Sequence, residues 1–140
     1  MREQRYHGLR QAFLAALGVR LAWWSWRRRP FLVAVEGASM APTLQPGDLM
    51  VAIRPKHLSR GSLVVVEHPQ RPGFEMVKRL VAGCGEVVEG RTLGSNEWWV
   101  VGDAPTASTD SRVFGPIERS AIRGEVVARY WPLSRLALFG

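Results

Sequence analysis

Short apolar runs separated by turn-forming residues dominate the chain from residue 31 onward. The segments between the runs, PTLQPGD, KHLSRG and PQRPG, hold the proline, glycine and polar residues that are typical of turns. We therefore predict a succession of short β-strands. The first four are rich in β-branched and other apolar residues: FLVAVEG (31–37), LMVAIRP (49–55), GSLVVVEHP (61–69) and FEMVKRLVAG (74–83).

Two further stretches extend this strand pattern toward the C-terminus. GEVVEGRTLGSNEWWVVGD (85–103) predicts a hairpin with its loop near residues 94–96, and AIRGEVVARYWP (121–132) predicts a last strand. No long helical period, internal repeat or linker divides residues 31–140. The pattern therefore predicts a mainly β domain, a single antiparallel sheet coiled into a sandwich-like or barrel-like shape.

Residues 1–30 follow a different pattern, which predicts a separate apolar helix. The run AFLAALGVRLAWWSW (12–26) is apolar except for Arg20 and Ser25. As a helix, this run rises about 22 Å, which is short of the roughly 30 Å of hydrocarbon in a bilayer. One face of the helix would carry Phe13, Leu14, Leu17, Leu21 and Trp24.

The end of this run has the residue types of a membrane interface. Trp23, Trp24 and Trp26 directly precede Arg27–Arg29, an aromatic belt beside a basic flank. We therefore expect residues 10–29 to contact membrane lipid and the protein to associate with the cytoplasmic membrane. The alternative is a helix that packs on the protein's own body or on a partner. Because arginines flank the run on both sides, the side of the membrane that holds the body stays open.

The distribution of charge argues against binding of nucleic acid. The net charge is +7, but residues 1–30 carry seven arginines and one acid, whereas residues 31–140 carry 12 bases and 11 acids. A nucleic-acid-binding domain carries its basic patch on the folded body. Cys84 is the one cysteine, which excludes an intrachain disulfide, and the three histidines are dispersed. We expect no metal and no cofactor.

A serine in the loop after the first strand is the first candidate for chemistry. Ser39 lies in VEGASMAPTLQPGDLM (35–50), between glycines and prolines. A serine hydroxyl becomes a useful nucleophile when a base removes its proton, and no histidine occurs near Ser39 in a recognisable motif. A lysine is the alternative base, but its ordinary pKa of about 10.4 must fall by about three units, roughly 4 kcal/mol.

Lys78 meets this demand better than Lys56, the other lysine. In the strand FEMVKRLV, alternation places Lys78 on one face with Phe74, Met76 and Leu80, and Glu75 on the opposite face. Apolar neighbours lower a lysine pKa because they disfavour the charged form. Lys56 lies in the loop RPKHLSRG, where we expect a solvated ammonium group.

Three stretches resemble the sequence motifs of type I signal peptidases. GASMAPTLQPGD (37–48) resembles the serine box of this family, VKRLVAGCGE (77–86) its lysine box and GDAPTASTDSRVFGPI (102–117) its third box. The three motifs occur in the family's order and together span residues from about 33 to 131. The resemblance implies a membrane-linked serine endopeptidase with a Ser/Lys dyad and a mostly β catalytic domain, residues 31–140.

Carried over to the matching positions, the resemblance assigns a role to each polar residue. It implies that Ser39 is the nucleophile, that Lys78 is the general base and that Ser108 orients the lysine amine. Asp110 and Arg112 would form a salt bridge beneath the dyad. Met40 would line the substrate cleft or pack in the core. Turn formation is expected for the pairs Gly47–Asp48 and Gly102–Asp103.

Two positions depart from the family pattern, and one segment is short. Gly37 stands where some members carry a serine that donates to the oxyanion, so the backbone N–H of Ser39 must supply more of the stabilisation. Ala104 stands where asparagine is usual, which leaves a side-chain contact unmade. Only 23 residues separate Lys78 from Gly102, too few for a large inserted β-domain. The chain thus looks like the compact branch that includes mitochondrial inner-membrane peptidases and maturation proteases for nickel superoxide dismutase.

The expected function is removal of N-terminal leaders from precursor proteins through an acyl-enzyme. One alternative is a specialised maturation protease for a nickel superoxide dismutase precursor, in which case a cytoplasmic location is expected. A self-cleaving Ser/Lys repressor would need a DNA-binding domain, for which 30 residues are too few. An alternative of another class is a catalytically silent β-module that binds peptides or membranes.

Overall fold

The computed structural model describes residues 14–23 and 28–140. Contacts divide the chain into two units, Met1–Pro30 and Phe31–Gly140. In the first unit, residues 14–23 form a helix with exposed side chains; Phe13 and Trp24 of the expected apolar face lie outside the described residues. Within the described ranges, no helix is both long enough and apolar enough to cross a membrane.

The second unit is mainly β, which confirms the predicted fold class. Short 3₁₀ turns at Pro105–Ala107, Arg119–Ala121 and Leu133–Arg135 and the one-turn helix α2 (Ser111–Phe114) connect some of its strands. The strands are β1 (Phe31–Ala34), β2 (Leu49–Ile53), β3 (Leu63–Glu67), β4 (Glu75–Ala82), β5 (Val87–Val88), β6 (Arg91–Thr92), β7 (Glu97–Val101), β8 (Ile117–Glu118), β9 (Ile122–Trp131) and β10 (Ala137–Leu138).

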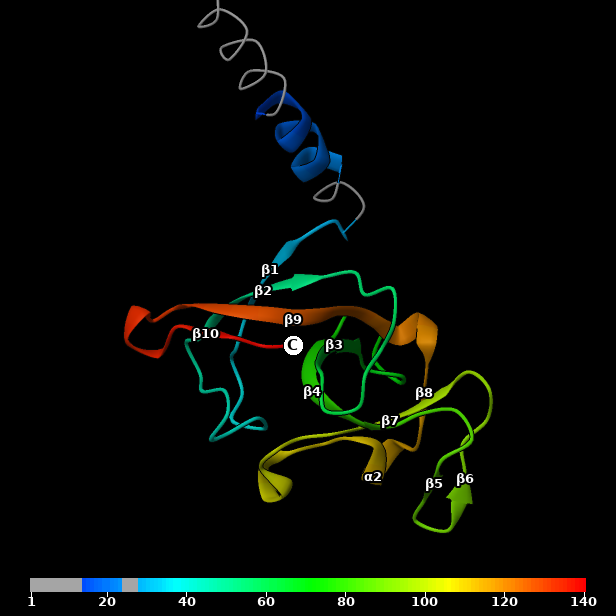
Figure 1. Cartoon of the computed structure of the whole chain (residues 1–140). Helices are drawn as coiled ribbons and strands as arrows, with labels where there is room; N and C mark the ends of the chain where they lie inside the picture. The colour runs from blue at the N-terminus through cyan, green and yellow to red at the C-terminus, as the bar shows by residue number, and fades with distance from the viewer. Residues whose placement is uncertain (1–13, 24–27) are drawn as a thin grey trace, which may run out of the picture. The chain divides into compact units, whose positions relative to one another are not determined.

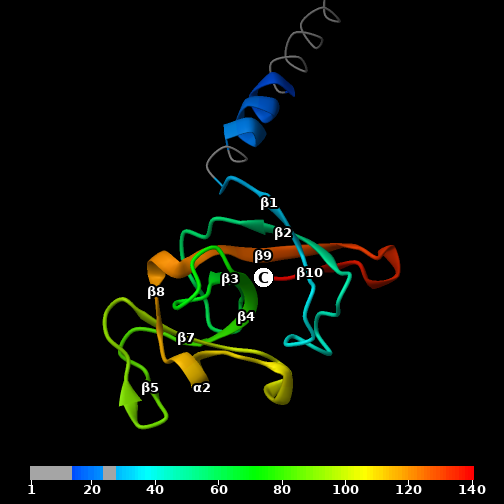
Figure 2. The same ribbon diagram turned by 180° about the vertical axis from the view of Figure 1, so that it is seen from behind.

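The long strand β9 organises the main sheet. One edge of β9 pairs with β2, and the other edge pairs with β3 and then with β10, all antiparallel. The sheet continues from β3 to β4, β7 and β8, and β1 flanks β2 at the opposite end. Figure 1 shows β9 crossing the unit beside β2, with β3 and β4 curling away from it, and the reverse view in Figure 2 shows the same arrangement. This is the coiled antiparallel sheet that the strand pattern predicts.

The predicted hairpin in residues 85–103 is wrong in its pairing. The hairpin turn lies at Glu89 and Gly90, between β5 and β6. The chain does turn at residues 94–97, but the strands before and after that turn, β6 and β7, do not pair. Both residues of the hairpin turn have positive φ, 50° and 78°, the two-residue geometry that matches the twist of paired strands. β7 leaves this hairpin and pairs instead with β4 and β8.

An apolar core holds the loop after β1 against the sheet. Met40 and Leu44 of this loop are buried with residues of β2, β3 and β9. A second cluster packs β3, β4, β7 and β8 together. Because two side chains of the loop, Met40 and Leu44, pack in the core, the path of the loop between them is fixed. The first cluster contains Val35, Met40, Leu44, Met50, Ala52, Leu63, Val65 and Val126; the second contains Val64, Val66, Leu80, Val100, Ile117 and Ile122.

The end of the same loop is fixed by a buried carboxylate. Gly47 has φ of 92° and forms the expected turn, but Asp48 does more than form a turn. Its carboxylate is buried, forms ion pairs with Arg129 and Arg135, and accepts from the backbone N–H of Gln45 at 2.9 Å. Burial by itself would raise the pKa of Asp48, but these donors together hold it below its ordinary value.

Candidate active site

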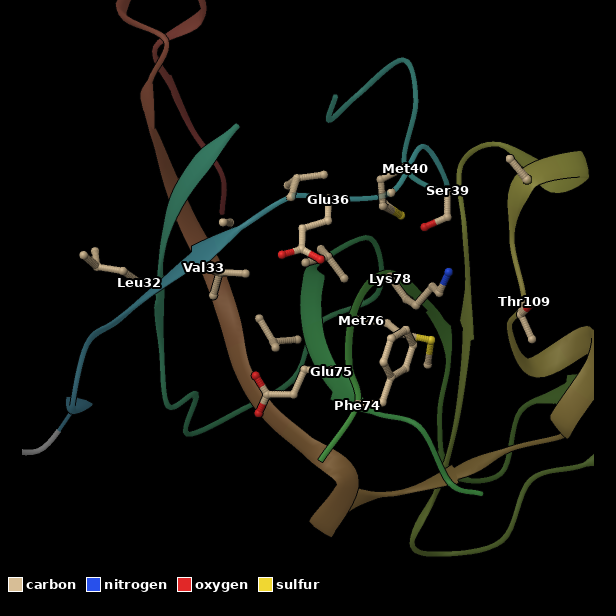
Figure 3. Close-up of a pocket in the computed structure, with 16 residues that line it drawn as sticks. Leu32, Val33, Glu36, Ser39, Met40, Phe74, Glu75, Met76, Lys78 and Thr109 are labelled. Atoms are coloured by element: carbon tan, nitrogen blue, oxygen red, sulfur yellow. The ribbon is translucent and has the colours of Figure 1, made fainter. Parts of the chain in front are cut away.

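A pocket of about 570 Å³ opens between the β1 side and the β4 side of the second unit. Ser39 and Lys78 both line it, and Figure 3 shows their polar ends directed into the same space. No hydrogen bond joins the Ser39 hydroxyl to the Lys78 amine in this unit. The remaining lining residues lie at 32–37, 74–77 and at Met40, Val65, Ala107 and Thr109.

Two strand edges that lack a neighbouring strand flank this pocket. β1 ends the sheet, since among the described residues it pairs only with β2. β4 pairs with β3 along residues 75–79, but its other edge meets β7 only from Arg79 onward. Unpaired edges leave backbone donors and acceptors free for another extended chain. Edges of this kind can pair with an extended peptide.

Lys78 projects from β4 into the interior beside the pocket. Its side chain is buried, with 2% of its surface exposed, and alternate residues Leu80 and Ala82 on the same face are buried too. Burial lowers the pKa of Lys78 from its ordinary value; the negative charge of Asp110 opposes this effect, and the positive charge of Arg112 adds to it. A larger fraction of neutral amine is therefore present than in a lysine that is exposed to water.

Ser108 connects the lysine amine to a buried carboxylate. The Nζ of Lys78 donates to Ser108 Oγ at 2.9 Å, and Ser108 Oγ donates to Asp110 Oδ2 at 2.7 Å. The Ser108 hydroxyl thus uses its proton on Asp110 and presents a lone pair to the amine. This chain of hydrogen bonds fixes where the lysine nitrogen lies.

Asp110 is fully buried and its carboxylate accepts from five donors. Arg112 donates through Nε at 2.9 Å and through Nη2 at 2.5 Å, and the backbone N–H of Gly102 donates at 2.8 Å, in addition to Ser108. Burial by itself would raise the pKa of Asp110, but hydrogen bonds from Arg112, Gly102 and Ser108 lower it far more. Asp110 also accepts from the backbone N–H of Arg112, which caps α2.

Gly102 allows the third motif to approach the serine loop. A Cβ placed at Gly102 would lie 2.2 Å from Ser108 Oγ and 2.6 Å from the carbonyl oxygen of Ser39. The same carbonyl accepts from the backbone N–H of Ala104 at 3.0 Å. Although alanine lacks the amide side chain that is usual at position 104, its backbone contacts the serine loop. Glycine is therefore required at position 102 by close packing rather than by a turn.

An ion pair that the sequence reasoning missed lies beside the site. Asp103, expected to form a turn with Gly102, accepts from Arg79 Nε at 2.8 Å and Nη2 at 2.6 Å and from the Thr43 hydroxyl at 2.6 Å. These residues join the serine loop, β4 and the third motif. Arg79 directly follows Lys78 in the lysine box, and Asp103 directly follows Gly102 in the third box. The opposite charges in these two motifs were the sequence signal that could have predicted the ion pair.

The residues expected around the oxyanion are placed as follows. Gly37 lines the pocket, and apart from its own chain neighbours no atom lies within 4 Å of a Cβ built there. The backbone N–H of Ser39 has no acceptor within residues 28–140, so it is free to donate to a ligand. Met40 is buried in the core and also borders the pocket. Across the described residues, no cluster of histidine, cysteine and carboxylate side chains has the arrangement of a metal site.

Comparison with known proteins identifies relatives over most of the chain. The family described as signal peptidase, peptidase S26, matches residues 7–94 and 86–131. The chain is 31% identical over 126 residues to mitochondrial inner membrane protease subunit 2 of Danio rerio, covering 77% of this chain and 68% of that protein.

Two other relatives are equally similar. Mitochondrial inner membrane protease subunit 1 of Homo sapiens is 31% identical over 119 residues, covering 74% of this chain and 70% of that protein. Mitochondrial ATP-independent inner membrane protease subunit 1b of Arabidopsis thaliana is 32% identical over 127 residues, covering 79% and 75%. With its coiled β-sheet and these matches, the chain belongs to the signal peptidase family, peptidase S26.

Proposed function

We propose that this protein is a serine endopeptidase that removes N-terminal leaders from precursor proteins. Ser39 is the nucleophile and Lys78 is the general base. The observation that carries the proposal is that a loop serine and a buried lysine with a lowered pKa face one pocket. Its relatives are named as proteases, which supports the same reaction.

The proposed reaction begins with the neutral amine of Lys78. As Ser39 Oγ attacks the scissile carbonyl, the Lys78 nitrogen accepts the hydroxyl proton. The free backbone N–H of Ser39 donates to the carbonyl oxygen as negative charge develops there. When the C–N bond breaks, the Lys78 ammonium returns its proton to the leaving amine, and the leader stays attached to Ser39 as an ester.

The second half of the reaction releases the leader. A water molecule attacks the ester carbonyl, and Lys78 accepts a proton from that water. The C–O bond to Ser39 breaks, and the serine oxygen regains a proton from Lys78. Ser108 is a positioning residue, because its lone pair holds the amine and its proton is bound by Asp110. The ion pair of Asp110 with Arg112 keeps that acceptor charged.

The substrate binds as an extended strand between the unpaired edges of β1 and β4. Backbone hydrogen bonds to both edges supply affinity without regard to sequence, whereas the pocket walls select side chains. We expect small residues near the scissile bond, next to the loop that carries Ser39. This binding mode accounts for two sheet edges that face one pocket.

We also propose that the protein acts at a membrane. Relatives are named as inner membrane proteases, and the helix at residues 14–23 exposes Leu14, Leu17 and Leu21. Leucines on one helical face insert into the lipid interface when a basic flank attracts phospholipid. The helix would thereby hold the catalytic unit near precursors that are themselves at the membrane.

A cleavage assay in detergent tests the Ser/Lys assignment. We expect Ser39→Ala and Lys78→Ala each to reduce cleavage of a leader-peptide reporter by about a thousandfold or more, because each removes a member of the reacting pair. Lys56→Ala is the matched control, since Lys56 is exposed; it should cleave at the wild-type rate. Wild-type activity in either of the first two variants, with circular dichroism showing a native fold, would exclude the dyad.

A further inference from the structure

The loop that carries Ser39 is closed at its base, and its backbone decides where the serine oxygen lies. The serine loop comprises residues 35–48. The N–H of Val35 donates to the Asp48 carbonyl at 2.9 Å, and the N–H of Gly47 donates to the Val35 carbonyl at 2.8 Å. The Lys78 amine is bonded to Ser108 and not to the Ser39 hydroxyl within residues 28–140. The contacts that hold the loop backbone therefore set the distance between Ser39 and Lys78.

The part of the serine loop next to Ser39 is a single turn that ends at Thr43. The N–H of Leu44 donates to the Met40 carbonyl at 2.8 Å and closes this turn. The Thr43 hydroxyl donates to Asp103 of the third motif at 2.6 Å. Because the turn is closed and short, a displacement of Thr43 is transmitted to Ser39.

Arg129 of β9 holds Thr43 from the other side. Its Nη1 donates to the Thr43 carbonyl oxygen at 2.8 Å and to Asp48 Oδ2 at 3.2 Å. Its Nε donates to the Arg135 carbonyl oxygen at 2.5 Å. The Arg129 side chain is 12% exposed, and its guanidinium lies 5.8 Å from the centre of the Phe139 ring. One planar guanidinium thus joins the serine loop to the segment that follows β9.

Arg135 holds the end of the serine loop through one contact. It lies in the turn Leu133–Arg135, before β10 returns beside β9 (Figure 1). Its Nη2 forms an ion pair with Asp48 Oδ1. Its Nε is buried and has no acceptor within residues 28–140. The contribution of Arg135 therefore depends on its positive charge at Asp48 and not on the shape of its guanidinium.

Buried charges at this place favour a positioning role over a stabilising one. Asp48 is 1% exposed, and the loss of hydration of a carboxylate and two guanidinium groups offsets much of their attraction. Apolar side chains of similar volume would stabilise the loop about as well. Hydrogen bonds depend on direction, whereas apolar contacts do not. The charged set thus fixes an orientation of the loop backbone that apolar packing would leave variable.

We propose that Arg129 and Arg135 are positioning residues for the proposed nucleophile and act on Ser39 through Thr43 and Asp48. This inference rests on the proposed function and adds two residues outside the three motifs to its machinery. Their contacts hold the half of the serine loop that the third motif does not reach. The Ser39 oxygen is thereby kept at the distance and angle that attack on a carbonyl requires.

Three variants test the two arginines separately. Arg129→Lys keeps the charge but has one nitrogen, which cannot serve the three acceptors that Arg129 binds. We expect kcat for the leader-peptide reporter to fall about 10- to 100-fold with KM unchanged, because alignment is lost and substrate binding is not. Arg135→Gln should lower kcat about tenfold. Arg135→Lys should restore most of that loss, because it keeps the one ion pair.

A control variant separates positioning from a general loss of stability. Ile122→Val removes a buried methyl group at the opposite end of β9, in the cluster that contains no residue of the serine loop. It should lower the melting temperature but keep the wild-type kcat well below that temperature. A wild-type kcat in both Arg129→Lys and Arg135→Gln overturns the inference. If Arg129→Lys does not fold, equal kcat values in Arg135→Gln and Arg135→Lys overturn it.

The pH profile shows whether the defect lies at the serine or at the base. The charges that act on the pKa of Lys78 are those of Asp110 and Arg112, which the arginine variants leave in place. We therefore expect the acidic limb of kcat to keep its wild-type position while the plateau falls. A shifted limb would mean that the variants act on Lys78, and it would overturn the inference.

Hydrogen exchange tests the hold on the loop without any cleavage. The N–H groups of Leu44 and Gln45 are bonded within the serine loop, so their exchange reports its opening. Arg129→Lys should raise exchange in residues 40–48 about tenfold and leave that of β3 unchanged. Faster exchange together with no cleavage by the wild type would refute the peptidase and retain the positioning of the loop. Unchanged exchange together with cleavage by the wild type would do the reverse.

Discussion

At the residue scale, the charges around Lys78 act in opposite directions on its pKa. Burial lowers that pKa, Arg112 lowers it further and Asp110 raises it. In the proposed reaction the Lys78 amine must be neutral to accept the proton of Ser39, so we expect activity to rise with pH through the pKa of Lys78 and then level off. On this proposal the neighbouring charges set the pH at which cleavage begins.

This opposition predicts two shifts of opposite sign in the pH profile. Asp110→Asn removes the negative charge, so the pKa of Lys78 falls and the acidic limb of kcat/KM moves to lower pH. Arg112→Gln removes the positive charge, so the limb moves to higher pH. Both variants should also cleave more slowly, because the first changes the acceptor of Ser108 and the second removes the guanidinium that holds this acceptor in place. Profiles measured on the leader reporter check this; shifts in the same direction would contradict the electrostatic role.

Sequence reasoning at this scale predicted the burial of Lys78 but missed the partners of two buried or half-buried carboxylates. Alternation along β4 put Lys78 on a buried face, and the structure has it buried. Asp48 and Asp103 were expected to form turns, yet both carboxylates bind arginines far away in the sequence. The residues next to a position in the sequence predict its backbone conformation. The ion-pair partner of a carboxylate depends instead on which distant segments the fold brings together.

At the element scale, the strands were predicted from alternation and turn residues, and β1 to β4 occur where those runs lie. The pairing of β7 was not predicted. β7 directly follows the β5–β6 hairpin in the sequence, and sequence alone does not distinguish such a strand from a strand of the hairpin itself. Glu89 has positive φ without being glycine, asparagine or aspartate, so the sequence lacked the usual turn signal there. β10 is two residues long and gives no periodic pattern.

The helix at residues 14–23 yields a prediction about membrane binding. Leu17 and Leu21 lie one turn apart on the same face. We expect Leu17→Glu/Leu21→Glu to weaken binding to vesicles containing about one-third anionic phospholipid by about tenfold or more, because two exposed leucines that would insert into the lipid interface are lost. Co-sedimentation measures this, and cleavage of a soluble peptide should be unchanged.

A second double variant controls for the added charge. Ala15→Glu/Ala22→Glu introduces the same two charges on the other side of the helix, where small side chains contribute less apolar surface. It should weaken vesicle binding less. Equal losses in the two variants would mean that charge, and not the leucine face, determines binding.

At the scale of the whole molecule, the site is assembled from three distant segments. The serine loop, β4 and the third motif meet because the sheet curls, and Asp103, Arg79 and Thr43 join the same three segments. The order of the three motifs along the sequence predicts which residues belong to such a site. The distances between those residues depend on pairings between strands that are far apart in the sequence. The pocket lies between the unpaired edges of β1 and β4, which are far apart in the sequence. No single stretch of the sequence therefore predicts it.

The buried Lys78 has a consequence for the stability of the fold. A lysine in an apolar interior destabilises the native state in proportion to the fall in its pKa. We expect Lys78→Met to raise the free energy of unfolding by about 1–2 kcal/mol and the melting temperature by about 3–6 °C, while activity disappears. Ser108 still donates to Asp110 in this variant, so no buried donor is left without an acceptor.

The sign of this effect with pH is fixed. The native pKa of Lys78 lies below that of the unfolded chain, so the unfolded state binds more protons between those two values, and wild-type stability rises with pH there. The gain from methionine should therefore be largest below the native pKa and should shrink toward pH of about 10.4. Calorimetry across this range, with Lys56→Met as the exposed control, measures it. Lys78 thus lowers the free energy of unfolding of the native chain. A chain freed from the need for the proposed reaction could raise this free energy by replacing Lys78 alone.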